Sequence, residues 1–330
     1  MTKDNYYRLN SRAIPRPSGA SDQVQKAIID MPQPDVDQWQ ENRPSSPDEW
    51  QEISDQIDTL DREFIAENFD KNSVTVKQRE IAGVNVYDLS PQVIDSAHDN
   101  FLFICLHGGG YFSGQGEAGL SEAMLVATNL NVRVLAVDYR MPPQFPFPAA
   151  LDDVVTVYEA MLEQYPSTAI LLGGSSAGGS LVLSAMHKFR ELELDIPGAL
   201  FVGTPWADLT KTGDSYFCNE GLDRALVSYE GPLAAAAKLY AGSVSLDHPL
   251  VSPIYGFFDG FPPTFLVSGT RDLFLSNTVR VHTKMRAAGV IADLIVFEGQ
   301  SHGDYALLID SVESQLHFNE LFAFMRKYLD

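Results

Sequence analysis

The sequence has little cysteine, little basic charge and no long apolar run. Its two cysteines, Cys105 and Cys218, form neither a disulfide framework nor a metal-ligand cluster. Residues 1–19 contain charged residues and prolines without a continuous apolar segment, so we expect neither a signal peptide nor a membrane anchor, and hence a cytoplasmic protein. No internal repeat or low-complexity segment interrupts the chain.

Basic residues are outnumbered by acidic ones, 23 to 44, which gives a formal net charge of −21 over 330 residues. A charge of this sign repels nucleic acid and anionic membrane surfaces and disfavours polyanionic substrates. The hydrophobic content is 45%, enough to bury a large core. We therefore expect a globular protein that acts on a small molecule and binds neither nucleic acid nor membrane.

The first 70 residues read differently from the rest. An irregular arm with one helix at 21–31 is predicted up to about residue 45. A second helix is predicted from 46 to 69, because Ser46, Pro47 and Glu49 form a capping box with proline at the first helical position. Its predicted apolar face consists of Trp50, Ile53, Ile57, Leu60 and Phe64.

A hairpin is predicted next, and strands and helices alternate after it. The predicted strands are 74–81, 84–89, 101–106, 132–137, 169–172, 200–203, 264–268 and 292–297, and the predicted helices are 120–130, 149–165, 177–190, 276–288 and 304–330. This alternation predicts an α/β fold, with a mostly parallel sheet, helices on both faces and a site at the carboxyl ends of the strands. Only residues 206–252 interrupt it, with no strand and one helix candidate at 233–240, which is typical of a lid or binding element.

The pattern Gly174-x-Ser176-x-Gly178 lies between a predicted strand and a predicted helix. A serine at such a turn fits the nucleophile elbow, and the glycines suit a crowded backbone that leaves no room for Cβ atoms. Ser175 cannot be the centre, because Ala177 stands where its second glycine would be needed. The alternative is a glycine loop that serves only as a turn; a phosphate-binding loop is excluded, because no Gly-Lys-Ser/Thr follows.

A second glycine motif, His107-Gly108-Gly109-Gly110, directly follows the predicted strand 101–106. A loop of this kind places an oxyanion-hole N–H in lipases and esterases. Successive glycines let the backbone approach a developing negative oxygen. The motif is therefore a second indication, independent of the elbow, of the same chemistry.

An acyl-transfer serine needs a histidine base, and in this fold the order along the chain is serine, acid, histidine. His302 follows the last predicted strand on a loop and is the candidate base; the other downstream histidines are His187, His282 and His317 within predicted helices and His248 in the interrupted stretch. Asp272, just past the end of strand 264–268, is the candidate acid, although it could instead cap the helix that follows. The weaker alternatives are Asp208, Asp247, Asp259 and Glu298.

Together these motifs resemble the hormone-sensitive-lipase family of α/β-hydrolases, also known as bacterial family IV esterases. The resemblance covers roughly residues 100 to 305 and rests on residues 107–110, 138–143, 145–150, 174–179 and 205–209, and on Asp272 and His302. It implies that the N–H groups of Gly109, Gly110 and Ala177 form the oxyanion hole. It also implies a helical cap, made of residues 1–70 and 206–252, over a hydrolase core made of residues 71–205 and 253–330. Ser175 departs from the pattern, because many members carry an acidic residue there.

We therefore expect a serine hydrolase that needs neither cofactor nor metal and cleaves carboxylic esters with uncharged, short or medium acyl chains. Ser176 would attack the ester, His302 would carry the proton and Asp272 would hold the imidazole, with His107 and Gly108 supporting the oxyanion loop. A lactone hydrolase is the nearest rival. A non-catalytic receptor is the alternative from another class, since the plant gibberellin receptors resemble this family but lack the histidine that is present here. The sequence leaves open whether the protein forms a homodimer.

Overall fold

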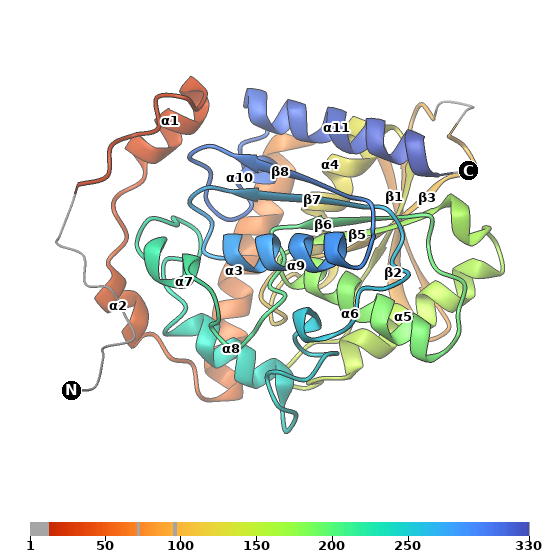
Figure 1. The fold of residues 1–330 in the computed structure, drawn as a ribbon, viewed down its shortest axis with the longest axis horizontal. Helices are drawn as coiled ribbons and strands as arrows, with labels where there is room; N and C mark the ends of the chain where they lie inside the picture. Colours follow the sequence, from red (N-terminus) through yellow and green to blue (C-terminus); the bar gives the residue numbers. More distant parts are fainter. Residues whose placement is uncertain (1–12, 71–72, 95–97, 330) are drawn as a thin grey trace.

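The computed structural model describes residues 13–70, 73–94 and 98–329, which fold around an eight-stranded sheet (Figure 1). The strand order is β1-β2-β4-β3-β5-β6-β7-β8; the pairs β1–β2 and β2–β4 are antiparallel, and all the other neighbours are parallel. The strands are β1 (Val74–Ile81), β2 (Val84–Pro91), β3 (Leu102–Leu106), β4 (Arg133–Val137), β5 (Ile170–Ser175), β6 (Ala199–Gly203), β7 (Thr264–Gly269) and β8 (Ala292–Phe297).

Helices cover both faces of this sheet. In chain order they are α1 (Asp22–Asp30), α2 (Val36–Glu41), α3 (Pro47–Asn68), α4 (Ser121–Leu130), α5 (Ala149–Leu162), α6 (Ala177–Glu191), α7 (Ser215–Cys218), α8 (Pro232–Ala241), α9 (Leu275–Ala287), α10 (Asp304–Leu307) and α11 (Val312–Tyr328), with short 3₁₀ turns at Gly116–Leu120, Ser167–Ala169 and Pro253–Tyr255. One buried cluster joins α5, α6 and α9 to the sheet, and another joins α4 and α11 to its other face (Figure 1). The predicted α/β fold is confirmed.

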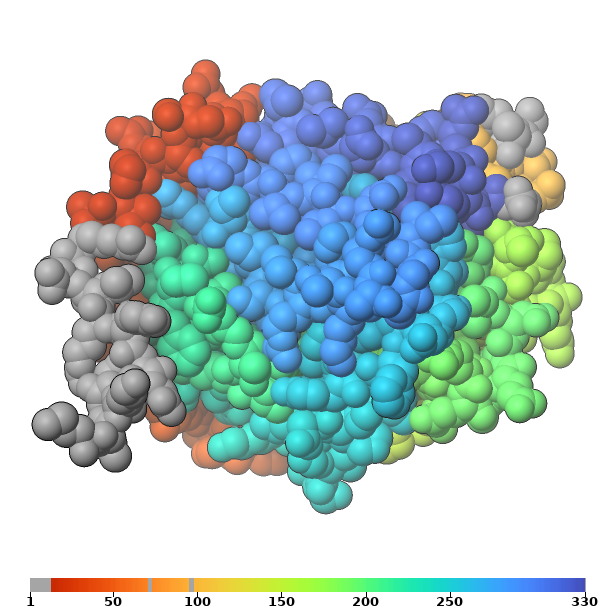
Figure 2. Space-filling model, in the orientation of Figure 1, coloured from red at the N-terminus to blue at the C-terminus, as the bar shows by residue number. Residues whose placement is uncertain are grey.

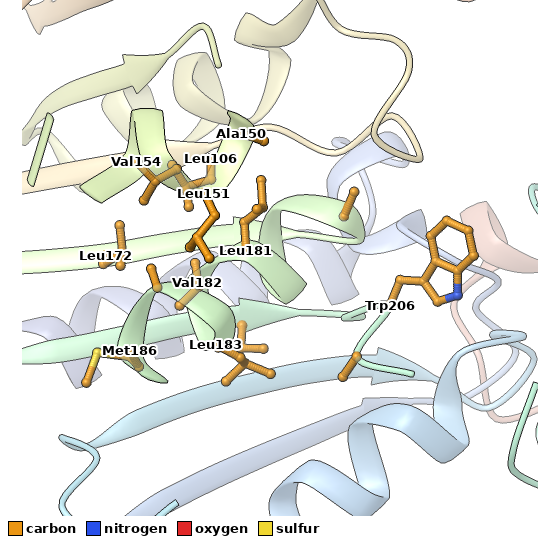
Figure 3. Packing of buried hydrophobic residues seen from close by; sticks show 14 of the residues in the cluster. Leu106, Ala150, Leu151, Val154, Leu172, Leu181, Val182, Leu183, Met186 and Trp206 are labelled. Atoms are coloured by element: carbon orange, nitrogen blue, oxygen red, sulfur yellow. The ribbon is translucent and has the colours of Figure 1, made fainter. Parts of the chain in front are cut away.

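The larger of the two clusters explains why the sequences of the central strands are continuous apolar runs. Leu106 of β3 and Leu172 of β5 are fully buried, because α5 and α6 cover them (Figure 3). Figure 3 shows Trp206 apart from these leucines, beyond the end of β6, where the polar residues of the site begin. The strands β3, β5, β6 and β7 are thus shielded from water, as parallel sheets require, whereas the edge strand β8 keeps exposed side chains.

The structure differs from the prediction at several helices. The C-terminal helix is two helices, because the chain breaks after α10 and Ser311 caps α11 by accepting a hydrogen bond from Ser314 N at 3.1 Å. The arm contains α2, and the interrupted stretch contains α7 besides the predicted helix; neither α2 nor α7 was predicted. The capping box of α3 is confirmed, but its buried side chains are Trp50, Ser54 and Asp58, whereas Leu60 is 65% exposed.

The N-terminal segment contacts residues that lie far from it in the sequence. Ser21 N donates to Glu313 Oε1 of α11 at 2.8 Å, and Arg271 Nη2 donates to Pro15 O at 3.0 Å. In Figure 2, α1 accordingly lies against the blue surface of the C-terminal region. Among the described helices, none is long and apolar enough to cross a bilayer.

Candidate active site

Ser176 lies at a sharp turn between β5 and α6. Its backbone has φ 59° and ψ −120°, a strained conformation for a residue with a side chain. Hydrogen bonds on both sides hold the turn: Ser176 N donates to Gly203 O at 2.9 Å, and Trp206 N donates to Ser176 O at 3.0 Å. A Cβ at Gly178 would lie 1.9 Å from Leu106 O, so only glycine lets β3 pass this closely.

The glycine loop after β3 runs beside this serine. A Cβ at Gly108 would lie 3.4 Å from the Ser176 Cβ, and both Gly109 and Gly110 have positive φ angles, of 89° and 58°. In the described part of the chain, the N–H groups of Gly109, Gly110 and Ala177 donate no hydrogen bond. The Ala177 amide also opens helix α6, where the helix dipole favours negative charge. Three unpaired donors therefore lie near Ser176, as an oxyanion hole needs.

His107 and Tyr139 support the glycine loop from below. The two rings stack with centroids 4.1 Å apart, and the Tyr139 hydroxyl donates to His107 O at 2.7 Å. Burial lowers the pKa of His107 to about 4, so its ring is neutral at physiological pH. His107 is therefore placed as a loop support and not as a charged group.

Asp272 and His302 are brought together at the carboxyl ends of β7 and β8. His302 Nδ1 lies 3.0 Å from Asp272 Oδ1, and both residues are buried. Asp272 Oδ1 also accepts a hydrogen bond from Phe274 N at 2.8 Å, and its Oδ2 accepts one from Ser268 Oγ at 2.7 Å. The alternative role of capping α9 is not what the structure shows, because Phe274 occupies the N-cap position.

The protonation of His302 reflects opposing influences. Burial by itself lowers the pKa of this imidazole, but the Asp272 charge and hydrogen bond, together with the charges of Asp223 and Asp304, raise it above the ordinary value of 6.5. Because Nδ1 faces Asp272, Nε2 is the nitrogen left to exchange a proton. In the described residues no hydrogen bond joins Ser176 Oγ to His302, a contact that commonly tightens only when substrate binds.

Thr204 is a site residue that the sequence analysis missed. Its hydroxyl lies 3.0 Å from His302 Nδ1 and is hydrogen-bonded to Asp272 Oδ2, and its φ of 36° is unusual for a β-branched residue. The signal available in the sequence was its place directly after the predicted strand 200–203, where a parallel sheet presents its site.

Three further residues from the interrupted stretch brace the acid and histidine loops. Asn219 Nδ2 donates to Asp272 O at 2.8 Å, and Asp223 Oδ2 accepts a hydrogen bond from Leu273 N at 2.7 Å. Arg224 forms an ion pair with Asp304 at 2.5 Å, two residues beyond His302. Nothing in the local sequence pattern singled them out, because they lie in irregular chain.

The remaining candidates lie apart from this arrangement. Asp208 pairs with Arg280 at 2.6 Å, Asp247 is bonded to Ser245, and Asp259 and Glu298 are exposed. His187 and His317 are buried in α6 and α11, as expected for packed histidines. Within the described ranges, no group of three or more histidine, cysteine, aspartate or glutamate side chains could hold a metal ion.

Comparison with known proteins gives the same fold and a consistent activity. Residues 103–306 match the α/β-hydrolase fold family. An acetyl-hydrolase of Streptomyces hygroscopicus is 32% identical over 53% of this chain and 58% of its own length, and an esterase of Acinetobacter venetianus is 28% identical over 69% of this chain and 74% of its own.

Solved structures extend the match to nearly the whole chain. The crystal structure of the esterase E25 is 46% identical, with a TM-score of 0.94 over 99% of this chain and 100% of its own. An esterase from the bacterial hormone-sensitive lipase family is 26% identical, with a TM-score of 0.81 over 94% of this chain and 99% of its own. The chain therefore belongs to the α/β-hydrolases of the hormone-sensitive-lipase type and is a carboxylic ester hydrolase.

Proposed function

We propose that Ser176, His302 and Asp272 are the catalytic triad of this hydrolase and that its substrates are uncharged esters with short or medium acyl chains. The observation that carries the proposal is the buried Asp272–His302 pair, 3.0 Å apart, at the same edge of the sheet as the Ser176 elbow. These residues follow the carboxyl ends of the parallel strands β5, β7 and β8, where sites of open α/β sheets lie.

The mechanism follows from the position of each group. Ser176 Oγ attacks the acyl carbon while His302 Nε2 takes its proton, and Asp272 stabilises the imidazolium that forms. The N–H groups of Gly109, Gly110 and Ala177 bind the tetrahedral oxyanion, and the loss of one such donor typically raises the barrier by about 3–4 kcal/mol. His302 then protonates the leaving alcohol and activates the water that cleaves the acyl-enzyme.

The preference for shorter chains follows from a roof that we assign to residues 13–70 and 206–252; residues 1–12 of the predicted cap lie outside the described residues. Trp39 Nε1 of α2 donates to Ser228 O at 3.2 Å, so the two segments are joined. The Tyr240 ring of α8 stacks on Tyr111, beside the glycine loop, with centroids 3.7 Å apart. A roof closed in this way limits the length of the acyl group that fits over Ser176. A cytoplasmic location stays a prediction from the sequence.

The test is a panel of p-nitrophenyl esters of graded acyl length, assayed beside simple lactones, with the wild type and Ser176→Ala. We expect turnover of short and medium esters, and a loss of about 10⁴- to 10⁶-fold in the variant. Near-normal activity of folded Ser176→Ala would contradict the triad. Faster turnover of lactones than of all the esters would favour the rival function with the same triad.

A further inference from the structure

A buried hydrogen-bond network lies directly behind the nucleophile. Ser175 Oγ, one residue before Ser176, is 2.5 Å from the hydroxyl of Tyr305, three residues after His302. The same Ser175 hydroxyl donates to Glu122 Oε1 of α4, the helix that follows the oxyanion loop. The network thus connects the two segments that carry the proposed nucleophile and base, and it joins both to α4.

The direction of these hydrogen bonds follows from the number of protons. When Ser175 donates its one hydroxyl proton to Glu122, the Tyr305 hydroxyl donates to Ser175 Oγ. Burial raises the pKa of Glu122 to about 7. A neutral carboxyl keeps the network intact, since its carbonyl oxygen still accepts from Ser175.

The network is confined as well as buried. Tyr305 is 1% exposed and Glu122 is 9% exposed. A Cβ at Gly203 would lie 2.1 Å from the Tyr305 hydroxyl and 2.3 Å from Ser175 Oγ. The two hydroxyl groups therefore pack directly against the Gly203 backbone, with no room for a side chain at that position. That backbone also accepts the amide hydrogen of Ser176 through Gly203 O. A shift of Tyr305 or Ser175 would therefore be transmitted to the elbow.

From this geometry we infer that Ser175, Tyr305 and Glu122 are positioning residues that set the separation of Ser176 and His302. The inference rests on the proposed triad. In the described residues Ser176 Oγ and His302 have no direct hydrogen bond, whereas Ser175 and Tyr305 are bonded. Misplacement of reacting groups by about 1 Å can cost about 10²-fold in rate, so a bond between their near neighbours has a direct catalytic consequence.

The first experiment removes single hydroxyl groups and separates kcat from KM. Tyr305→Phe, Ser175→Ala and the double variant are assayed with p-nitrophenyl butyrate. We expect each single variant to lose about 10- to 100-fold in kcat, with KM within about twofold of the wild type. Because both changes break the same bond, the double variant should be no worse than the more damaged single variant.

Tyr158→Phe is the matched control. Tyr158 is also fully buried, and its hydroxyl donates to Asp195 O at 2.7 Å, away from the catalytic loops. We expect Tyr158→Phe to lose thermal stability as Tyr305→Phe does, but to keep wild-type kcat. Equal kcat losses in the two variants, or multiplicative losses in the double variant, would overturn the inference.

Rescue by a conservative change tests Glu122. Glu122→Gln keeps an acceptor for Ser175 and should retain kcat, whereas Glu122→Leu should lose as much as Ser175→Ala. Wild-type kcat in folded Tyr305→Phe would refute the positioning role but leave the triad standing if Ser176→Ala is inactive. Activity in Ser176→Ala would instead refute the proposed function itself.

Discussion

At the residue scale, the four groups around the Asp272 carboxylate explain how the imidazole is held. Oδ1 accepts from Phe274 N and faces His302 Nδ1, while Oδ2 accepts from Ser268 and Thr204. With all of these groups in place the carboxylate cannot rotate. The neutral His302 ring is therefore held in the tautomer that carries its proton on Nδ1. Its Nε2 faces away from Asp272 and can accept a proton.

Asp272→Asn should lower kcat about 10⁴-fold, because an amide that donates to Nδ1 stabilises the wrong tautomer of His302. Turnover of a short p-nitrophenyl ester measures the effect. Asp259→Asn and Glu298→Gln are matched controls, because both carboxylates are exposed and weaker candidates from the sequence. If either control loses activity while Asp272→Asn does not, the assignment of the acid is wrong.

The pH dependence of kcat/KM should follow His302, which must be neutral to accept a proton. Since the surrounding carboxylates raise the pKa of His302 above 6.5, activity should rise with pH through a midpoint above 6.5 and then level off. Rates measured from about pH 5 to about pH 9 test this.

Other groups that titrate in this range need a control. Burial raises the pKa of Glu122 to about 7 and, with the charge of Asp272, raises the pKa of Asp223 to about 6. Glu122→Gln and Asp223→Asn remove these titrations. The midpoint should persist in Glu122→Gln. In Asp223→Asn it should move to lower pH, because that charge helps to raise the pKa of His302. A flat profile in the wild type would exclude a histidine base.

At the scale of helices and strands, the sequence predicted what depends on local pattern. The alternating strands and helices, the capping box of α3 and the hairpin of β1 and β2 were all recognisable, because their signals repeat within a few residues. The buried face of α3 could not be recognised in this way. Asp58 is buried there because it accepts a hydrogen bond from Gly114 N at 2.6 Å, and Gly114 lies far from it in the sequence. The roles of Glu122, Thr204 and Asp223 were missed for the same reason, because their hydrogen-bond partners lie far away in the sequence, on other strands and loops.

Truncation and a point substitution together can separate two roles of the N-terminal arm. Residues 13–33 contact the histidine side of the core, where a Cβ at Gly299 would meet Pro17 at 2.4 Å, whereas α2 contacts Ser228 in the proposed roof. Deletion of residues 1–45 should therefore lower kcat/KM for the preferred ester at least about tenfold and alter chain-length preference, because the ester loses its contacts with the roof and water weakens the hydrogen bonds that stabilise the oxyanion.

Trp39→Ala is the companion variant, because it disturbs only the roof contact. It should change chain-length preference without loss of folded protein. If both the truncated protein and Trp39→Ala keep the wild-type preference, the arm is not part of a roof over Ser176.

At the scale of the whole molecule, the net charge of −21 acts on every approaching substrate. An ester with an acidic acyl group should have a lower kcat/KM than a neutral ester of equal length, and added salt should narrow the difference, because the Debye length falls from about 10 Å at 0.1 M to about 3 Å at 1 M. Initial rates over a salt series measure this, with the neutral ester as the control. Parallel salt dependences for the two esters would rule out a role for the overall charge.

The hydrogen bond between Ser21, the N-cap of α1, and Glu313 of α11 joins segments that are synthesised far apart in time. Translation delivers the Ser176 elbow well before it delivers His302, and Glu313, the partner of Ser21, is made later still. A growing chain thus carries the proposed nucleophile without the proposed base, and α1 lacks its contact with α11. With the proposed triad, ester cleavage can begin only after His302 has been made, so a product truncated before His302 should be inert.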